Sequence, residues 1–152
     1  MGINIVKTIK IDTRDFKTDL LFDKILLDAP CSGLGVIAQK PELRWRITPV
    51  NVKELSRLQF ELLEKALLFL RPGGELLYST CTLTDKENID IVTKFAEKYS
   101  DKVELLAIED DLKRLNLNHL ISLTNKNCLE LFPPISKTEG FFMAKIRKNE
   151  GV

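Results

Sequence analysis

Two cysteines, Cys31 and Cys81, each follow an apolar, strand-like run and are the residues best suited to covalent chemistry. A thiolate is a strong nucleophile when its pKa is lowered, and a second thiol, hydroxyls and an acid nearby can move protons around a covalent intermediate. Asp28 lies three residues before Cys31 and could supply that acid. Free cysteine is also among the most often buried residues, so a role as a small apolar group is the competing interpretation.

Other uses of the cysteines are weaker hypotheses. A redox pair usually occurs as CxxC, whereas 81 − 31 = 50 residues separate these two. Cys128 lies in a weakly patterned segment and is predicted to be buried as an apolar group. The three cysteines and the single His119 lack the spacing of metal ligands, so we predict no metal site.

A strand, a helix and a second strand must position the two cysteines. Residues 22–28 and 75–80 are predicted strands, and Thr48 and Pro49 have the residue types of a helix N-cap and first helical position. Apolar residues then recur every three or four positions until residues 71–74, whose sequence Arg-Pro-Gly-Gly stops the helix. A right-handed crossover makes the two strands parallel, so both cysteines are expected at the carboxyl edge of the sheet, where α/β folds bind ligands.

The rest of the chain completes a single α/β domain over residues 1–152, without repeats or linkers. The predicted elements are a half-buried strand at 3–12, a helix after a capping box at 84–87, a strand at 103–108, a weakly patterned segment at 110–127, a rigid turn at 131–134 and a last, antiparallel strand at 140–146.

Composition points to a globular protein without a global attraction for nucleic acid. Of 152 residues, 44% are hydrophobic and 30% charged, and the net charge is +1, so any RNA contact has to be local. No apolar run approaches the roughly 20 residues of a membrane helix, and no signal peptide is recognisable. We expect a cytoplasmic protein with no membrane partner.

The long loop after Cys31 carries the local basic cluster Lys40, Arg44, Trp45 and Arg46. Cationic side chains beside an aromatic ring suit phosphates and a splayed-out base. A solvated loop that covers the sheet edge is an equally good interpretation.

Several short motifs together resemble one family, the S-adenosylmethionine-dependent RNA cytosine-5 methyltransferases that include the Sun/Fmu and NOL/NOP/NSUN enzymes. The similarity runs through residues 3–147. The motifs lie at residues 28–33 (Asp-Ala-Pro-Cys-Ser-Gly), 40–45, 58–59, 70–74, 78–82 (Tyr-Ser-Thr-Cys-Thr), 87–88, 131–133 and 140–142.

The resemblance implies a role for each cysteine. The Thr-Cys motif of the family supplies the nucleophile, here Cys81, which adds to carbon 6 of cytosine and makes carbon 5 reactive. The Pro-Cys motif supplies Cys31, which helps to remove the carbon 5 proton and to release the enzyme. Asp28 would stabilise the covalent adduct and face the cofactor.

The resemblance also implies a cofactor, S-adenosylmethionine, and an RNA substrate, ribosomal or transfer RNA. Asp12, Asp28 and Pro30 match the positions assigned to the cofactor, with Asp12 at its adenine edge and Pro30 also shaping the base pocket. Lys40, Arg44, Trp45 and Arg46 would contact RNA.

One part of the family pattern is missing. No glycine-rich turn of the cofactor site is found, and the amino-terminal residues align just before the third strand of the methyltransferase order 3-2-1-4-5-7-6. We therefore predict an incomplete Rossmann-like fold, a mostly parallel sheet with an antiparallel last strand and without the first two strands. The predicted strand at 3–12 should then be loose, and the edge of the strand at 22–28 should be exposed.

The resulting hypothesis is a carboxy-terminal portion of a methyltransferase catalytic domain, truncated or split, that needs a complementary amino-terminal half. The alternative is a noncatalytic RNA-binding or regulatory subunit that keeps the fold. Retention of both cysteines and Asp28 favours the enzyme.

Overall fold

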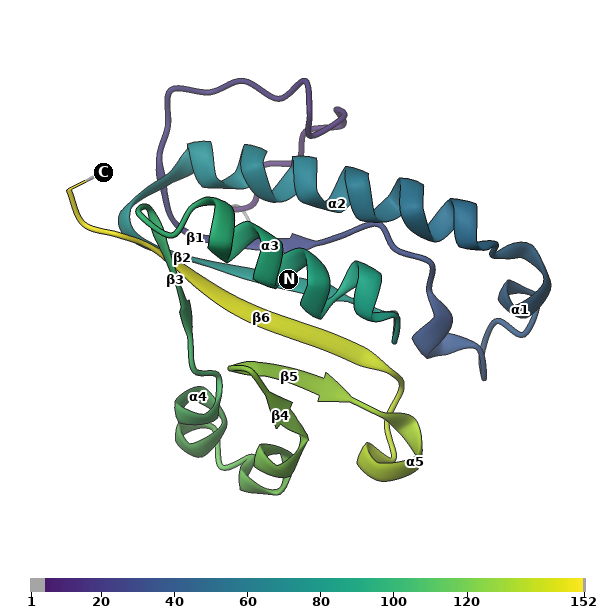
Figure 1. Cartoon of the computed structure of the whole chain (residues 1–152). Coiled ribbons are helices and arrows are strands. Elements are labelled where there is room, and N and C mark those ends of the chain that lie inside the picture. The colour runs from purple at the N-terminus through teal and green to yellow at the C-terminus, as the bar shows by residue number, and fades with distance from the viewer. Residues whose placement is uncertain (1–4, 152) are drawn as a thin grey trace.

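Six strands form one sheet in the computed structural model, which describes residues 5–151 (Figure 1). The strands are β1 (Phe22–Asp28), β2 (Leu70–Thr80), β3 (Val103–Leu106), β4 (Thr124–Asn125), β5 (Cys128–Leu131) and β6 (Phe141–Lys148). The helices are α1 (Leu43–Arg46), α2 (Pro49–Phe69), α3 (Ile89–Lys98), α4 (Glu109–Arg114) and α5 (Pro133–Ser136), with short 3-10 helices η1 (Leu34–Val36), η2 (Asp85–Glu87) and η3 (Asn118–Leu123).

The β1–α2–β2 unit forms as predicted. Thr48 caps α2 through a reciprocal pair of hydrogen bonds with Asn51, and Pro49 occupies the first turn. β1 and β2 pair in parallel, from Lys24 opposite Glu75 to Asp28 opposite Ser79. β2 begins at Leu70, earlier than predicted, because the Arg-Pro-Gly-Gly segment already belongs to the strand, with Gly73 at φ 72° beside an irregular register.

The last strand, β6, runs antiparallel to its neighbours and is inserted among them. It pairs with β2, β3 and β5, so these three strands and β1 share one direction while β6 and the short β4 run the opposite way. The predicted α/β class, with an antiparallel last strand, is confirmed. Within residues 5–151, only the β1–β2 pair is hydrogen-bonded in parallel, because β6 separates β2 from the other strands of the same direction.

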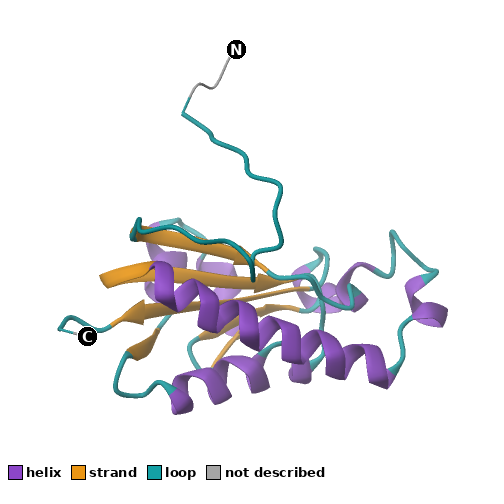
Figure 2. Ribbon diagram, turned by 90° about the horizontal axis from the view of Figure 1, so that it is seen from above, coloured by secondary structure: helices purple, strands orange, loops and turns teal. Residues whose placement is uncertain are grey.

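The core lies between the sheet and the helices α2 and α3, which run side by side along one face (Figure 2). Its fully buried members include Leu63, Tyr78, Val92, Phe95 and Phe142. A smaller cluster around Leu112 and Leu129 buries part of the other face beneath α4 and η3. The helices thus hold β2 and β6 firmly, and β2 carries one of the two cysteines.

The strand predicted at 3–12 is wrong for the residues that the structure describes, whereas the prediction that this segment would be loose is confirmed for them. Residues 5–12 form no strand and run away from the sheet, and residues 3 and 4 lie outside the described part (Figure 2). Alternating apolar residues stabilise a strand only when one face is buried, whereas Ile5 is 94% exposed and Ile9 54%. β1 is the edge strand of the described sheet, and Leu26 on it is 67% exposed.

Two predictions about the second half of the chain also need correction. Thr84 and Glu87 do not cap α3: Thr84 precedes η2 and Glu87 is its last residue. α3 begins at Ile89, and the side chain of its N-cap, Asn88, makes no capping hydrogen bond to the helix. The rigid turn predicted at 131–134 begins with the last residue of β5 and continues into α5, whose first residue is Pro133. The strand at 103–108 is confirmed as β3, and the weakly patterned segment contains α4 and η3.

Residues 5–151 contain neither a membrane-spanning helix nor a cluster of metal-binding side chains. No helix in this range is both long and apolar enough to cross a membrane. The same residues contain no group of three or more histidine, cysteine or acidic side chains that could hold a metal ion.

Candidate active site

The two cysteines meet at the carboxyl edge of β1 and β2. Cys31 Sγ lies 3.4 Å from Cys81 Sγ, a distance at which one thiol donates a hydrogen bond to the other. Both are free and half-buried. The two cysteines therefore lie together at the end of a parallel strand pair, as the crossover rule predicted, although 50 residues separate them in the sequence. Cys128 instead lies in the core, 2% exposed.

Cys31 is held in its neutral form. Burial, followed by the hydrogen bond to Cys81, raises the pKa of the Cys31 thiol to about 12. The amides of Gly33 and Cys81 oppose this shift but do not cancel it. A thiol with a raised pKa is a weaker nucleophile at neutral pH than a thiolate.

Asp28 is the acid closest in the sequence to this pair, and it is anchored across the sheet. The Ser79 hydroxyl donates to Asp28 Oδ1 at 2.9 Å, and these two residues are register partners of β1 and β2. Asp28 is exposed, and within the described residues its Oδ2 has no hydrogen-bond partner. The carboxylate is thus fixed at the strand end with one oxygen open to a ligand.

A buried polar network lies behind the cysteines, with Glu87 at its centre. Glu87 has no exposed surface, and its carboxylate accepts hydrogen bonds from the amide and hydroxyl of Ser32, from Gln59 Nε2 and from the hydroxyls of Thr82 and Thr84. Ser32 directly follows Cys31, and Thr82 directly follows Cys81. The two cysteine segments are therefore joined through one carboxylate.

Two further buried side chains hold the segment around Cys81. Asn88 accepts a hydrogen bond from Thr80 Oγ1 at 2.6 Å and donates one to the Thr82 carbonyl at 3.0 Å. The Tyr78 hydroxyl donates to the Glu87 carbonyl at 2.7 Å. From the sequence, Gln59 and Asn88 were predicted only as parts of the family motifs, and Glu87 also as part of a capping box. The signal in the sequence that could have revealed this network is one acid, Glu87, and two amides, Gln59 and Asn88, at core-facing positions of amphipathic helical segments.

Asp12, the remaining predicted cofactor residue, is not brought to this site. It lies in a turn before Phe16, and Arg14 binds both of its carboxylate oxygens, the shortest contact being 2.7 Å. The side-chain hydrogen bond from Arg14 lowers the pKa of Asp12 to about 2. Within the described residues no hydrogen bond or ion pair joins Asp12 to Asp28 or Pro30. Pro30 itself is exposed beside the cysteine pair, and its carbonyl accepts from Gln59 Nε2 at 2.9 Å.

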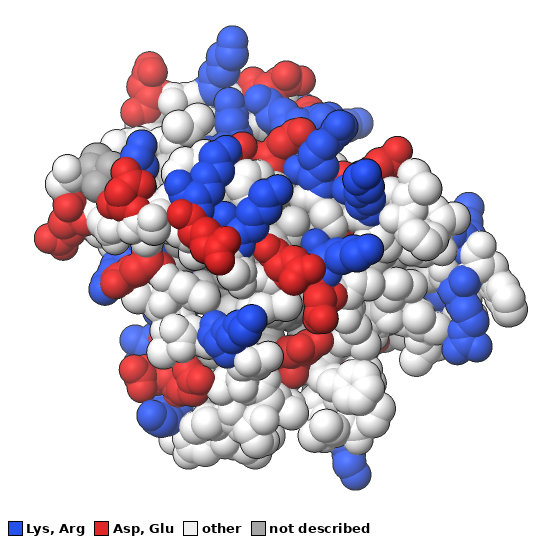
Figure 3. Space-filling model, viewed as in Figure 1, with Lys and Arg blue, Asp and Glu red and all other residues white. Residues whose placement is uncertain are grey.

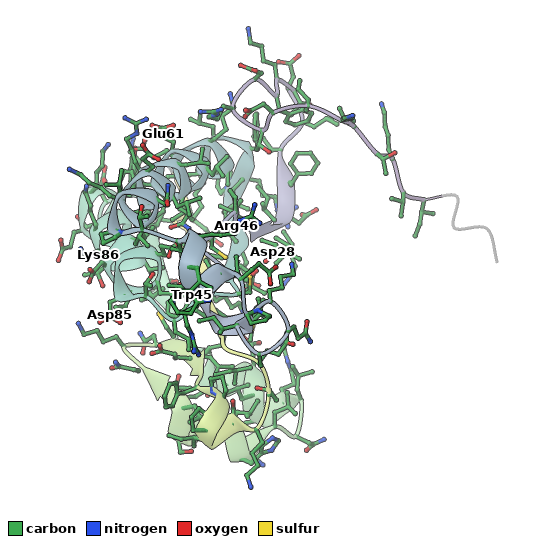
Figure 4. All side chains as sticks on the ribbon, turned by 90° about the vertical axis from the view of Figure 1, so that its right-hand side faces the viewer. Asp28, Trp45, Arg46, Glu61, Asp85 and Lys86 are labelled. Atoms are coloured by element: carbon green, nitrogen blue, oxygen red, sulfur yellow. The ribbon has the colours of Figure 1, made fainter. Side chains whose placement is uncertain are left out.

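The basic loop projects from the same side of the molecule as Asp28. Figure 4 shows Trp45 and Arg46 on the side that carries Asp28, and Trp45 is 83% exposed. Lys40, Arg44 and Arg46 are exposed and form no ion pair with any described residue. On the face drawn in Figure 3, positive and negative side chains are otherwise interspersed, so the loop is a local feature.

The sequence of the chain also matches a protein-family model. The model described as 16S rRNA methyltransferase RsmB/F matches residues 1–147, nearly the whole chain. The chain belongs to this family. The resemblance inferred from the cysteine motifs is thereby confirmed.

Individual members of the family are also similar to this chain in sequence. The chain is 40% identical over 153 aligned positions to ribosomal RNA small subunit methyltransferase F of Escherichia coli O7:K1, a match that covers 99% of this chain and 31% of that protein. This RsmB/F family member thus spans about a third of the length of the curated relatives it matches.

Solved structures extend the similarity to three dimensions. The crystal structure of PH0851 superposes with a TM-score of 0.81 at 34% identity, covering 95% of this chain and 31% of that one. The structure of NSun6 from Pyrococcus horikoshii with SFG superposes with a TM-score of 0.70 at 32% identity, covering 93% of this chain and 34% of that one. The partial Rossmann-like methyltransferase fold is therefore confirmed.

Proposed function

We propose that this chain supplies the cysteine pair of an RNA cytosine-5 methyltransferase that acts on ribosomal RNA. The observation that carries the proposal is the 3.4 Å contact between Cys31 and Cys81 at the carboxyl edge of the sheet. The names of the curated relatives favour ribosomal RNA over transfer RNA as the substrate.

In the proposed reaction, Cys81 is the nucleophile. Its thiolate adds to carbon 6 of cytosine, and the electron density released to carbon 5 forms the bond to the incoming methyl group. The carbon 5 proton then passes to a solvent water, a transfer that Cys31 assists, and the Cys81–carbon 6 bond breaks to restore the ring double bond and the Cys81 thiolate.

Asp28 is proposed to bind at the cytosine N3 or exocyclic amine and to face the cofactor. Its Oδ1 is held by Ser79 and its Oδ2 is free for a ligand, which fits this role. Pro30, exposed next to Cys31, would line the same pocket.

S-adenosylmethionine is the proposed cofactor, and when bound it supplies the methyl group. A structural neighbour at 32% identity was solved with SFG, an analogue of S-adenosylmethionine. Asp28 and Pro30 fit the cofactor assignment by position. Asp12 stays a prediction: both of its oxygens are bound by Arg14, so Asp12 would have to release that side chain to hold an adenosine.

We further propose that a complementary amino-terminal portion completes the enzyme. β1 is an edge strand in the described sheet, and a groove of about 540 Å³ on the sheet face beside it is lined by Leu26, Leu77, Leu115 and other apolar residues. Leu26 and Leu115 are more than 60% exposed, an arrangement typical of surfaces that another segment covers.

Covalent trapping tests the proposed chemistry. RNA containing 5-fluorocytosine, which has no carbon 5 proton to lose, is incubated with S-adenosylmethionine, the 152-residue chain and a separately produced amino-terminal portion of a relative. We expect a denaturation-resistant adduct that Cys81→Ala abolishes. On ordinary RNA, Cys31→Ala should accumulate covalent RNA that the unmodified chain releases.

The controls separate the enzyme from its alternative. An adduct that survives in Cys81→Ala would refute the assignment of the nucleophile. RNA binding without any adduct in the complemented protein would favour a noncatalytic RNA-binding subunit. Tight binding of S-adenosylmethionine by the chain alone would contradict the need for a complementary portion.

A further inference from the structure

Different parts of the molecule hold the two cysteines. Cys81 directly follows Thr80, which still pairs with Phe142 of β6, and its carbonyl accepts a hydrogen bond from the Gly35 amide at 3.0 Å. The last bond from the β1 chain to β2 is donated by the Ala29 amide to the Ser79 carbonyl at 2.9 Å. The sheet therefore fixes the residue before Cys81, and Gly35 binds the Cys81 carbonyl, whereas the chain that carries Cys31 leaves the sheet after Ala29.

Glu87 holds the residue that follows Cys31. The Ser32 amide donates to Glu87 Oε1 at 2.8 Å, and the Ser32 hydroxyl donates to Oε2 at 2.6 Å. Hydrogen bonds to a carboxylate are roughly twice as strong as neutral ones, and these two are fully shielded from water. No lysine or arginine among the described residues forms an ion pair with Glu87, so its oxygens are committed to these donors.

Gln59 binds the residue before Cys31 in a similar way. Its Nε2 donates to the Pro30 carbonyl at 2.9 Å and to Glu87 Oε1 at 3.1 Å. Cys31 is therefore flanked by two residues that the buried Gln59–Glu87 pair binds. The helix α2 and the 3-10 helix η2 that carry this pair both pack against the core.

We propose that Glu87 is the positioning residue that keeps Cys31 opposite Cys81. Loss of this carboxylate releases Ser32 and displaces Cys31, whereas Cys81 keeps its place because Thr80 stays paired with Phe142 and Asn88 still binds both Thr80 and Thr82. The consequence for catalysis rests on the proposed function: release of the covalent RNA depends on Glu87, while its formation does not. The positioning itself is a property of the chain alone.

Thr84 provides a matched control for a merely structural role of Glu87. Its hydroxyl donates to Glu87 Oε2 at 2.7 Å but is attached to neither cysteine segment directly. Thr84→Val removes one donor and leaves both bonds from Ser32. Glu87→Gln keeps the size of the side chain but brings an NH₂ group against the hydroxyls that now donate to this site.

A trivalent arsenical measures the positioning without any RNA chemistry. Phenylarsine oxide condenses with two thiols, forming two arsenic–sulfur bonds and releasing one water, so its affinity depends on two sulfurs held side by side. We expect the full chain to bind it through Cys31 and Cys81, and either cysteine-to-serine variant to lose this binding. Glu87→Gln should bind about tenfold more weakly because the pair is no longer preorganised, while Thr84→Val should stay within about twofold of the unmodified chain.

Two outcomes of this titration would overturn the proposal. One is a folded Glu87→Gln protein, checked by circular dichroism, that binds phenylarsine oxide as tightly as the unmodified chain. The other is a Thr84→Val protein that weakens binding as much as Glu87→Gln does. If Glu87→Gln does not fold, Ser32→Ala replaces it, since this variant removes the 2.6 Å bond and keeps Glu87; unchanged binding by that variant would also overturn the proposal.

Covalent RNA provides the second readout in the complemented enzyme. Glu87→Gln should accumulate covalent RNA on ordinary cytosine, as Cys31→Ala does, whereas a general loss of structure would prevent the adduct from forming. If Cys31→Ala accumulates the adduct and Glu87→Gln releases it normally, Glu87 does not position Cys31. If no adduct forms through Cys81 in any variant, the proposed function fails, and the arsenical titration still decides the positioning.

Discussion

Ser32 and Thr82, the residues that directly follow the two cysteines, meet hydroxyl to hydroxyl at 2.7 Å in the buried interior of the site. Both hydroxyls also reach Glu87 Oε2, at 2.6 Å from Ser32 and 3.4 Å from Thr82. Fifty positions separate Ser32 from Thr82 in the sequence. The contact therefore ties the end of β1 to the end of β2 beyond the last strand pairing.

This contact predicts a loss of stability in Ser32→Ala. The Thr82 hydroxyl and Glu87 both lose a buried partner, so we expect the free energy of unfolding to fall by about 1–3 kcal/mol. Urea denaturation followed by circular dichroism measures the change. Ser122→Ala, an exposed position on η3, is the control and should stay within about 0.5 kcal/mol of the unmodified chain. Equal losses in the two variants would contradict the prediction.

Tyr78→Phe should destabilise the protein through the backbone of Glu87. The Tyr78 hydroxyl is fully buried and donates to the Glu87 carbonyl, and burial raises the pKa of the phenol, which keeps it protonated as a donor. Its removal leaves a buried carbonyl without this donor, and we expect a loss of about 1–3 kcal/mol by urea denaturation. Tyr99→Phe is the matched control, since its hydroxyl donates to the partly exposed Glu64, which Lys98 also binds. A larger loss in the control would count against the buried network.

Cys128→Ala should change the dependence of stability on alkaline pH. Burial raises the pKa of both Cys128 and Cys31 to about 12 in the folded protein, from an ordinary value of 9.0. Between these values the unfolded chain loses the thiol protons and the folded chain keeps them, so stability is fully present below pH 9 and falls as the pH rises. Each thiol contributes a slope of about −1.4 kcal/mol per pH unit in this range.

The measurement is the free energy of unfolding of both proteins at several pH values from 8 to about 10.5, inside the range where the thiol linkage acts. The unmodified chain carries two such thiols and Cys128→Ala carries one, so the variant should lose stability less steeply. All other groups titrate equally in the two proteins. Parallel curves would mean that Cys128 is not held protonated in the core.

The sequence allowed the site to be located but not its supporting network to be recognised. Apolar runs and the crossover rule placed Cys31 and Cys81 at one edge, because strand direction follows from connectivity. The partnership of Glu87 with Ser32 joins residues 55 positions apart, and no local spacing records it. The capping box predicted for Thr84 and Glu87 does not form: the Thr84 hydroxyl donates to the Glu87 carboxylate instead of accepting from a backbone amide, within a 3-10 turn that places the carboxylate in the buried interior.

The failed strand at the amino terminus has a different cause. Alternation in residues 5–12 shows which side chains could face a core, but a strand also needs a neighbour to accept its backbone hydrogen bonds. The strand β5 is the opposite case. It is short and has little periodicity, yet it forms because β6 pairs with it on one side and β4 on the other. In both segments, tertiary contacts rather than local sequence determine whether a strand forms.

The basic loop yields a prediction about RNA that rests on the proposed function. Arg44 and Arg46 lie on α1 beside the exposed Trp45 and have no ion pair among the described residues, so they are available for phosphates. The double variant Arg44→Gln/Arg46→Gln should weaken RNA binding by the complemented enzyme and lower the slope of log K against log salt by about 1–2. Lys102→Gln/Lys113→Gln removes the same charge from exposed positions before β3 and on α4 and should leave this slope unchanged. Filter binding at four salt concentrations distinguishes the two, because a solvated loop with no RNA contact would give both double variants the same slope as the unmodified enzyme.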